Sequence, residues 1–100
     1  MNIQFNPSGF SISEQLEDFT AKKLSKLETF YDKIIDADVY FKMENHQKVK
    51  DKTTEIKLNV PGVTLFASET AKTFEAAVDL AAESLRRQIK KYKEKQNIYG

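Results

Sequence analysis

The sequence predicts an α+β fold in which two helices pack side by side on one face of a four-stranded mixed sheet. Four short segments alternate apolar with polar residues, as half-buried strands do. Two longer segments repeat apolar residues at helical spacing. The order of these segments is β-α-β-β-β-α. Because 100 residues are enough for one hydrophobic core and too few for two, we expect a single domain spanning residues 1–100.

Short polar signals mark the first strand and the start of the first helix. Residues 2–6 alternate in strand fashion, and the Pro-Ser-Gly segment at 7–9 ends the pattern. Two helix starts are compatible with the residues that follow: Ser13, directly before the periodic run, or Ser11 with Glu14 as a capping box. We favour Ser13 as the N-cap.

The first helix carries apolar residues at helical spacing from Leu16 onward, which predicts that it runs to about Tyr31 or Ile34. The lysines that line one flank of it are Lys22, Lys26 and Lys33. Lys23 instead falls inside the apolar arc. Either its aliphatic stem runs along the edge of the core, or the helix is rotated so that Lys23 emerges beside the flank.

The middle of the chain predicts three strands. Residues 36–46 alternate cleanly and form the second strand. Residues 47–52 are polar and basic, as in a hairpin tip, and we expect their lysines to be solvated. Residues 53–60 form the third strand. A Pro-Gly turn then leads to a fourth strand that starts at residues 63–67, with Phe66 on the polar face.

The last third of the chain predicts one long helix with a basic C-terminal half. Thr73 is the expected N-cap. The apolar residues that follow share one arc of the helix: Phe74, Ala77, Val78, Ala81, Ala82, Leu85, Ile89 and Tyr92. The remaining arc beyond Leu85 carries six cations: Arg86, Arg87, Lys90, Lys91, Lys93 and Lys95. Residues 86–95 contain one acid, whereas residues 1–85 contain ten lysines and fourteen acids.

The predicted topology brings the cations of both helices together. We expect the first two strands to be parallel with a right-handed crossover and the later strands to form an antiparallel meander, so both helices lie in one layer. The cations that can then share an outer surface are Lys22, Lys26, Arg86, Arg87, Lys90 and Lys91. A basic surface is typical of polyanion binding, because each neutralised phosphate releases counterions. For the final helix alone, the alternative is a solvated helix end that complements the macrodipole.

Composition argues against catalysis and against a membrane segment. The chain has no cysteine, so thiolate metal sites and thiol nucleophiles are excluded. His46 is the only histidine, and a zinc site or catalytic triad would lack its other members. No glycine-rich phosphate loop occurs. We therefore expect no enzyme activity, cofactor, metal or small-molecule substrate, and, since the apolar runs are short, a cytoplasmic protein.

Four segments of the sequence match the pattern of a known family. Residues 12–34 read ISEQLEDFTAKKLSKLETFYDKI, residues 67–68 read AS, residues 76–79 read AAVD and residues 85–91 read LRRQIKK. In these segments and in its element order, nearly the whole chain resembles the ribosome hibernation-promoting factors, which include ribosome-associated inhibitor A. The resemblance implies binding to the small ribosomal subunit between head and body, where the factor occludes the paths of messenger and transfer RNA and silences idle ribosomes during stress or stationary phase.

The resemblance also implies which residues contact ribosomal RNA. The cations at matching positions are Lys23, Lys26, Arg87, Lys91, Lys93 and Lys95. Lys22, Arg86 and Lys90 are added on charge alone. A contact from Lys23 would favour the rotated first helix.

The sequence departs from the family pattern in two places. Many relatives carry Asp-Met-Tyr where this chain has Thr73-Phe74-Glu75, which removes any contact made by the tyrosine. The chain also ends at Gly100 without the linker and second domain of long-form members, so we expect a short form that is monomeric when free. A second hypothesis stays open beside the ribosomal one: a protein-interaction module of the same fold whose basic helix binds an acidic protein.

Overall fold

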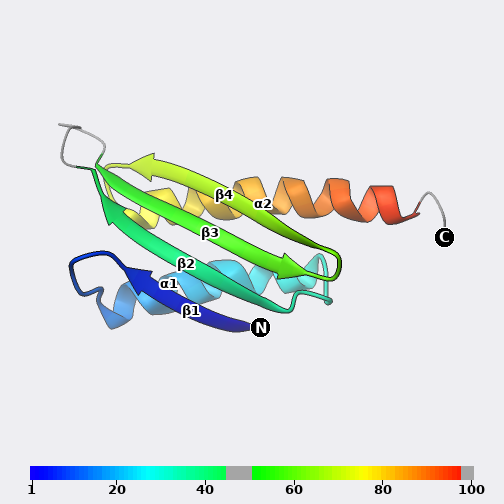
Figure 1. The fold of residues 1–100 in the computed structure, drawn as a ribbon, viewed down its shortest axis with the longest axis horizontal. Helices are drawn as coiled ribbons and strands as arrows, with labels where there is room; N and C mark the ends of the chain where they lie inside the picture. The colour runs from blue at the N-terminus through cyan, green and yellow to red at the C-terminus, as the bar shows by residue number, and fades with distance from the viewer. Residues whose placement is uncertain (45–50, 98–100) are drawn as a thin grey trace.

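The computed structural model describes residues 1–44 and 51–97 and confirms the predicted fold class and element order. The elements are β1 (Asn2–Pro7), α1 (Glu14–Ser25), the 3-10 helix η1 (Lys26–Thr29), β2 (Asp36–Met43), β3 (Lys52–Val60), β4 (Val63–Ala71) and α2 (Phe74–Asn97) (Figure 1). His46 and two of the lysines expected in the hairpin tip, Lys48 and Lys50, lie outside the described residues.

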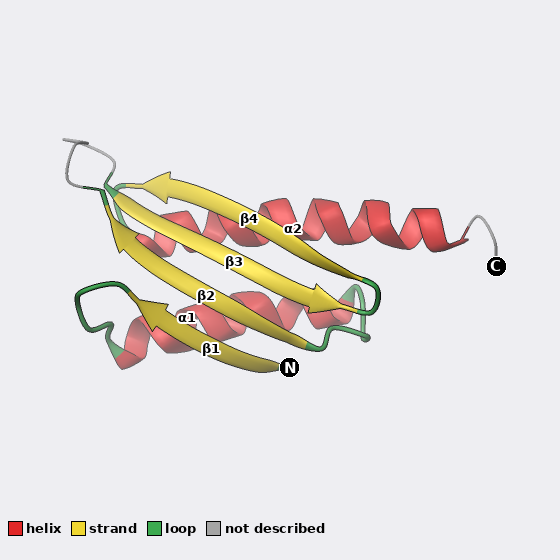
Figure 2. Ribbon diagram, viewed as in Figure 1, coloured by secondary structure: helices red, strands yellow, loops and turns green. Residues whose placement is uncertain are grey.

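The sheet has the strand order β1-β2-β3-β4, and both helices cover the same face of it (Figure 2). β1 pairs with β2 in parallel, and the other two pairings are antiparallel, as predicted. Val39, Ile56 and Leu58 point toward the helices and are fully buried. Phe66 lies on the other face and is 47% exposed, which confirms its predicted position. The hydrophobic core therefore lies between the sheet and the helices. The opposite face, called the open face below, lies outside the core.

The first helix begins where predicted but ends earlier. The Ser13 side chain accepts a hydrogen bond from the Leu16 amide at 3.1 Å, which confirms Ser13 as the N-cap. The prediction that α1 runs to Tyr31 or Ile34 is wrong, because α1 ends at Ser25 and the chain tightens into η1. A 3-10 turn repeats every three residues, so the three-residue spacing of Leu24 and Leu27 fits it as well as an α-helix.

The last helix is fixed at both ends of its buried part. Thr73 Oγ1 accepts from the Ala76 amide at 3.1 Å, as expected of the N-cap. Near the other end, the Tyr92 hydroxyl donates to the Pro61 carbonyl, and the Tyr92 ring packs edge-on against Tyr31 with centroids 6.2 Å apart. Gly62 lies below this hydroxyl at φ +90, a conformation that L side chains rarely adopt. Figure 1 shows that the C-terminal turns of α2 extend beyond the sheet.

Candidate functional site

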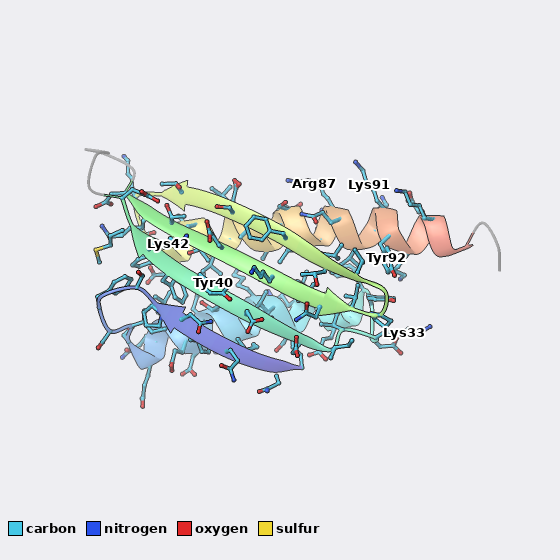
Figure 3. All side chains as sticks on the ribbon, in the orientation of Figure 1. Lys33, Tyr40, Lys42, Arg87, Lys91 and Tyr92 are labelled. Atoms are coloured by element: carbon cyan, nitrogen blue, oxygen red, sulfur yellow. The ribbon has the colours of Figure 1, made fainter. Side chains whose placement is uncertain are left out.

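The basic residues of α2 are all exposed, but they do not share one face. The six are Arg86, Arg87, Lys90, Lys91, Lys93 and Lys95. At roughly 100° per residue, Arg86 and Lys93 lie within about 20° of each other, and Arg87 and Lys91 lie about 100° and 140° round from Arg86. Figure 3 shows Arg87 and Lys91 projecting from α2 on the side away from α1. The cations therefore wrap round the exposed half of the helix.

A groove of about 250 Å³ separates the two helices. Lys26 of η1 lines one side of this groove, and Arg86 of α2 lines the other. The prediction that the cations of the two helices share one surface is therefore confirmed for these two residues. Lys22 is exposed in the last turn of α1. Arg87 and Lys91 instead line a shallow hollow on α2 itself. The basic region is thus a ridge along α2 that reaches α1 only at the groove.

Lys23 lies in the seam between the helices. Its Nζ is 2.8 Å from Asp79 Oδ1 of α2, and its side chain is one-third exposed. The ammonium also lies 5.3 Å from the centroid of the Phe19 ring. Of the two alternatives for Lys23, this geometry corresponds to a stem that runs along the edge of the core. The positive charge of Lys23 is paired with Asp79 in the fold. Asp79 would therefore compete with an RNA phosphate for the Lys23 ammonium.

One acid lies among the cations of α2. Glu83 Oε1 is 2.6 Å from Arg86 Nη2 and 3.6 Å from Arg87 Nη1. The hydrogen bond from Arg86 is the main reason that the pKa of the Glu83 carboxyl is lowered, and the same contact raises the pKa of the Arg86 guanidinium. Glu83 therefore stays ionised at neutral pH and offsets part of the positive charge at the groove.

Phe30 is part of this region, and sequence reasoning missed it. The apolar spacing places Phe30 in the core, but its side chain is 46% exposed and lines the interhelical groove. The Arg86 guanidinium carbon lies 6.0 Å from the ring centroid, and Lys93 Nζ donates to the Phe30 carbonyl. The signal in the sequence is the adjacent Tyr31, since one face of a helix rarely buries two neighbouring aromatic rings. In the structure Tyr31 takes the buried position.

The hydroxyl of Tyr31 is buried among core residues. Burial is the main cause that raises the pKa of Tyr31, with Tyr92 and Asp32 adding to it. Within residues 1–44 and 51–97, no three His, Cys, Asp or Glu side chains gather as metal ligands would. Neither helix in the same residues has an apolar stretch long enough to cross a bilayer. The candidate site is therefore the charged ridge of α2 together with the exposed ring of Phe30 beside it.

Comparison with known sequences gives matches over almost the whole chain. Residues 2–97 match the profile of the family described as sigma 54 modulation protein / S30EA ribosomal protein. The ribosome hibernation promoting factor of Pseudomonas putida is 35% identical over 96 residues, which cover 94% of this chain and 90% of that protein. The factor of the same name from Escherichia coli is 32% identical over 95 residues, which cover 95% of this chain and 96% of that protein.

Comparison with solved structures also gives matches over more than nine tenths of the chain. A ribosomal subunit interface protein from Coxiella burnetii matches with a TM-score of 0.83 and 31% identity, covering 94% of this chain and 99% of that one. The N-terminal domain of Protein Y from Thermus thermophilus matches with a TM-score of 0.80 and 26% identity, covering 92% of this chain and 99% of that one.

Proposed function

Since this chain belongs to the family of sigma 54 modulation proteins and S30EA ribosomal proteins, we propose that it associates with ribosomes and keeps idle ribosomes inactive. The match confirms the resemblance on which that expectation rests. Relatives from Pseudomonas putida and Escherichia coli are named ribosome hibernation promoting factors. Their names support a role of this chain in ribosome hibernation, and we infer from this role that it acts in translational control under stress.

The proposed binding site is ribosomal RNA of the small subunit, in the channel for messenger and transfer RNA. The observation that carries this proposal is the exposure of all six α2 cations within residues 86–95. The C-terminal end of their ridge, beyond Tyr92 at the β3–β4 turn, extends past the sheet, so this end can enter a groove between RNA segments without the sheet colliding with either (Figure 1). Lys22 of α1 and Lys26 of η1 add exposed positive charge. Lys23 of α1 adds a positive charge that is paired with Asp79 in the free protein.

Most of the binding free energy is expected to come from phosphate contacts. Lysine and arginine side chains on a convex helix reach backbone phosphates more readily than base edges in a narrow RNA groove. If each of the six α2 cations neutralises one phosphate, the logarithm of the binding constant falls with the logarithm of salt concentration at a slope of roughly −4 to −5. An acidic protein partner with few charge pairs would give a shallower slope.

The experiment is sedimentation of the protein with ribosomes at several salt concentrations, followed by translation in vitro. The wild type is expected to sediment with the small subunit and to inhibit translation. Arg87→Glu with Lys91→Glu is expected to lose both, because it reverses two charges on the α2 ridge. Both side chains are exposed, so the melting temperature is expected to stay near that of the wild type.

A matched control reverses two exposed lysines elsewhere. Lys57 lies on β3 and Lys72 on the segment before α2, and both are exposed. Lys57→Glu with Lys72→Glu changes the net charge by the same amount and is expected to leave ribosome binding nearly intact. Equal losses in the two double variants would mean that only net charge matters. A wild type that stays at the top of the gradient at low salt would refute the ribosomal proposal.

A further inference from the structure

Phe30 is an aromatic ring held at the surface by a rigid turn. Its amide donates to the Leu27 carbonyl at 3.0 Å, and the Tyr31 amide donates to the same carbonyl at 3.1 Å. Leu27 and Tyr31 are buried on either side of it, whereas Phe30 is 46% exposed. Because its neighbours are anchored in the core, the backbone of Phe30 has little freedom to bring the ring inside.

The ring lies against a basic hollow. The hollow has a volume of about 400 Å³, within the range of about 300–1,000 Å³ that is usual for small-ligand sites. Its lining residues are Phe30, Arg86, Ile89, Lys90, Lys93 and Glu94. Phe30 supplies the exposed apolar surface, Ile89 is buried beneath the hollow, and three cations face one acid around it. A ligand that fits this hollow is flat and apolar on one side and carries negative charge beside it.

We propose that Phe30 is a stacking platform for one unpaired nucleobase of single-stranded RNA, with the adjoining phosphates bound by Arg86, Lys90 and Lys93. The proposal rests on the proposed function and adds a base contact to its phosphate contacts. Nucleobases stack on exposed aromatic rings beside cations in proteins that bind single strands. An acidic peptide would use the cations but would leave the flat ring without a partner.

Stacking can be separated from charge because it releases no counterions. Phe30→Leu removes the aromatic ring and keeps most of the apolar volume. Loss of one stacked base is expected to weaken binding about 5- to 150-fold. The salt slope is expected to stay that of the wild type, whereas Arg87→Glu makes it shallower. Phe30→Tyr keeps the ring and is expected to restore binding.

The test uses a 12-nucleotide single-stranded RNA that contains 2-aminopurine, together with intact ribosomes. Stacking on Phe30 is expected to quench the fluorescence of 2-aminopurine with the wild type and Phe30→Tyr, and not with Phe30→Leu. Ribosome affinity is expected to follow the same order. In parallel, ultraviolet crosslinking of the wild type on ribosomes is expected to yield an RNA adduct on Phe30, a result that does not depend on any variant folding.

The outcomes distinguish this proposal from the function on which it rests. If Phe30→Leu binds ribosomes as the wild type does, or if adducts form only elsewhere on the chain, the stacking site is refuted and ribosome association stands. If a lower affinity of Phe30→Leu comes with a lower melting temperature and no adduct forms on Phe30, the residue is structural and the proposal is also refuted. If the wild type binds no ribosomes, the proposed function itself is refuted.

Discussion

The ion pair between Lys23 and Asp79 allows the structural and the binding role of Lys23 to be separated. The two charged atoms are 2.8 Å apart, and the side chains are 33% and 50% exposed. Ion pairs as exposed as this one contribute roughly 0.2–1 kcal/mol to stability. Asp79→Asn and Lys23→Gln each break the pair, so each is expected to lower the melting temperature by roughly 1–8 °C for a domain of this size.

The same two substitutions are expected to have opposite effects on ribosome binding. Asp79→Asn removes a carboxylate from the interhelical groove and leaves the ammonium of Lys23 available to a phosphate, so binding is expected to strengthen. Lys23→Gln removes the cation, so binding is expected to weaken. If Lys23 contacts one phosphate, its loss is expected to make the salt slope shallower by roughly 0.7 to 0.9.

The assay combines urea unfolding of the two variants and the double variant with sedimentation on ribosomes at four salt concentrations. A double-mutant cycle gives the coupling energy of the pair directly. A coupling energy above about 2 kcal/mol would refute the treatment of the pair as a solvent-screened contact. Weaker ribosome binding by Asp79→Asn would refute the idea that Asp79 competes with RNA, and would mean that it holds Lys23 in the binding orientation.

Two further predictions concern α2. Leu85 is fully buried and Leu80 is 48% exposed on the same helix. In urea denaturation, Leu85→Ala is expected to lower the free energy of unfolding by about 2–5 kcal/mol. Leu80→Ala is expected to lower it by less than about 0.5 kcal/mol, apart from the small difference in helix propensity between leucine and alanine. Similar losses for both would mean that the exposed face of α2 is packed in solution. Glu83→Gln is expected to tighten ribosome binding at moderate salt, because it removes the acid that pairs with Arg86 and Arg87. Unchanged sedimentation would mean that Glu83 does not lower the affinity of these arginines for RNA phosphates.

The open face of the sheet contrasts with the basic ridge. On it, Lys42 pairs with Glu55 at 3.0 Å, and the Asn59 side chain donates to Asp36. The ammonium of Lys57 lies 5.5 Å from the centroid of the Tyr40 ring. Lys57 therefore lies on the face opposite the helices, away from the α2 cations, which is why it is a suitable control position. On α2, by contrast, six exposed cations lie within residues 86–95.

The prediction of individual elements succeeded where the determinants are local. The caps at Ser13 and Thr73 were predicted correctly because in each the side-chain oxygen accepts from the amide three residues further along the chain. The predicted extent of α1 failed because a three-residue apolar spacing does not distinguish a 3-10 turn from an α-helix. The fourth strand was predicted to start at residues 63–67 and in fact continues to Ala71, since pairing with β3 as far as Lys52 extends it.

By itself, the sequence determined the order of strands and helices, the single apolar face of the sheet and the basic half of the last helix. These features follow from periodicity and composition, which act over a few neighbouring residues. Only the tertiary structure decided that Lys23 pairs with Asp79, that Phe30 is exposed and that Arg87 and Lys91 project away from α1. Each of these depends on how two packed helices are rotated about their axes, and that rotation is set by contacts between residues far apart in the chain.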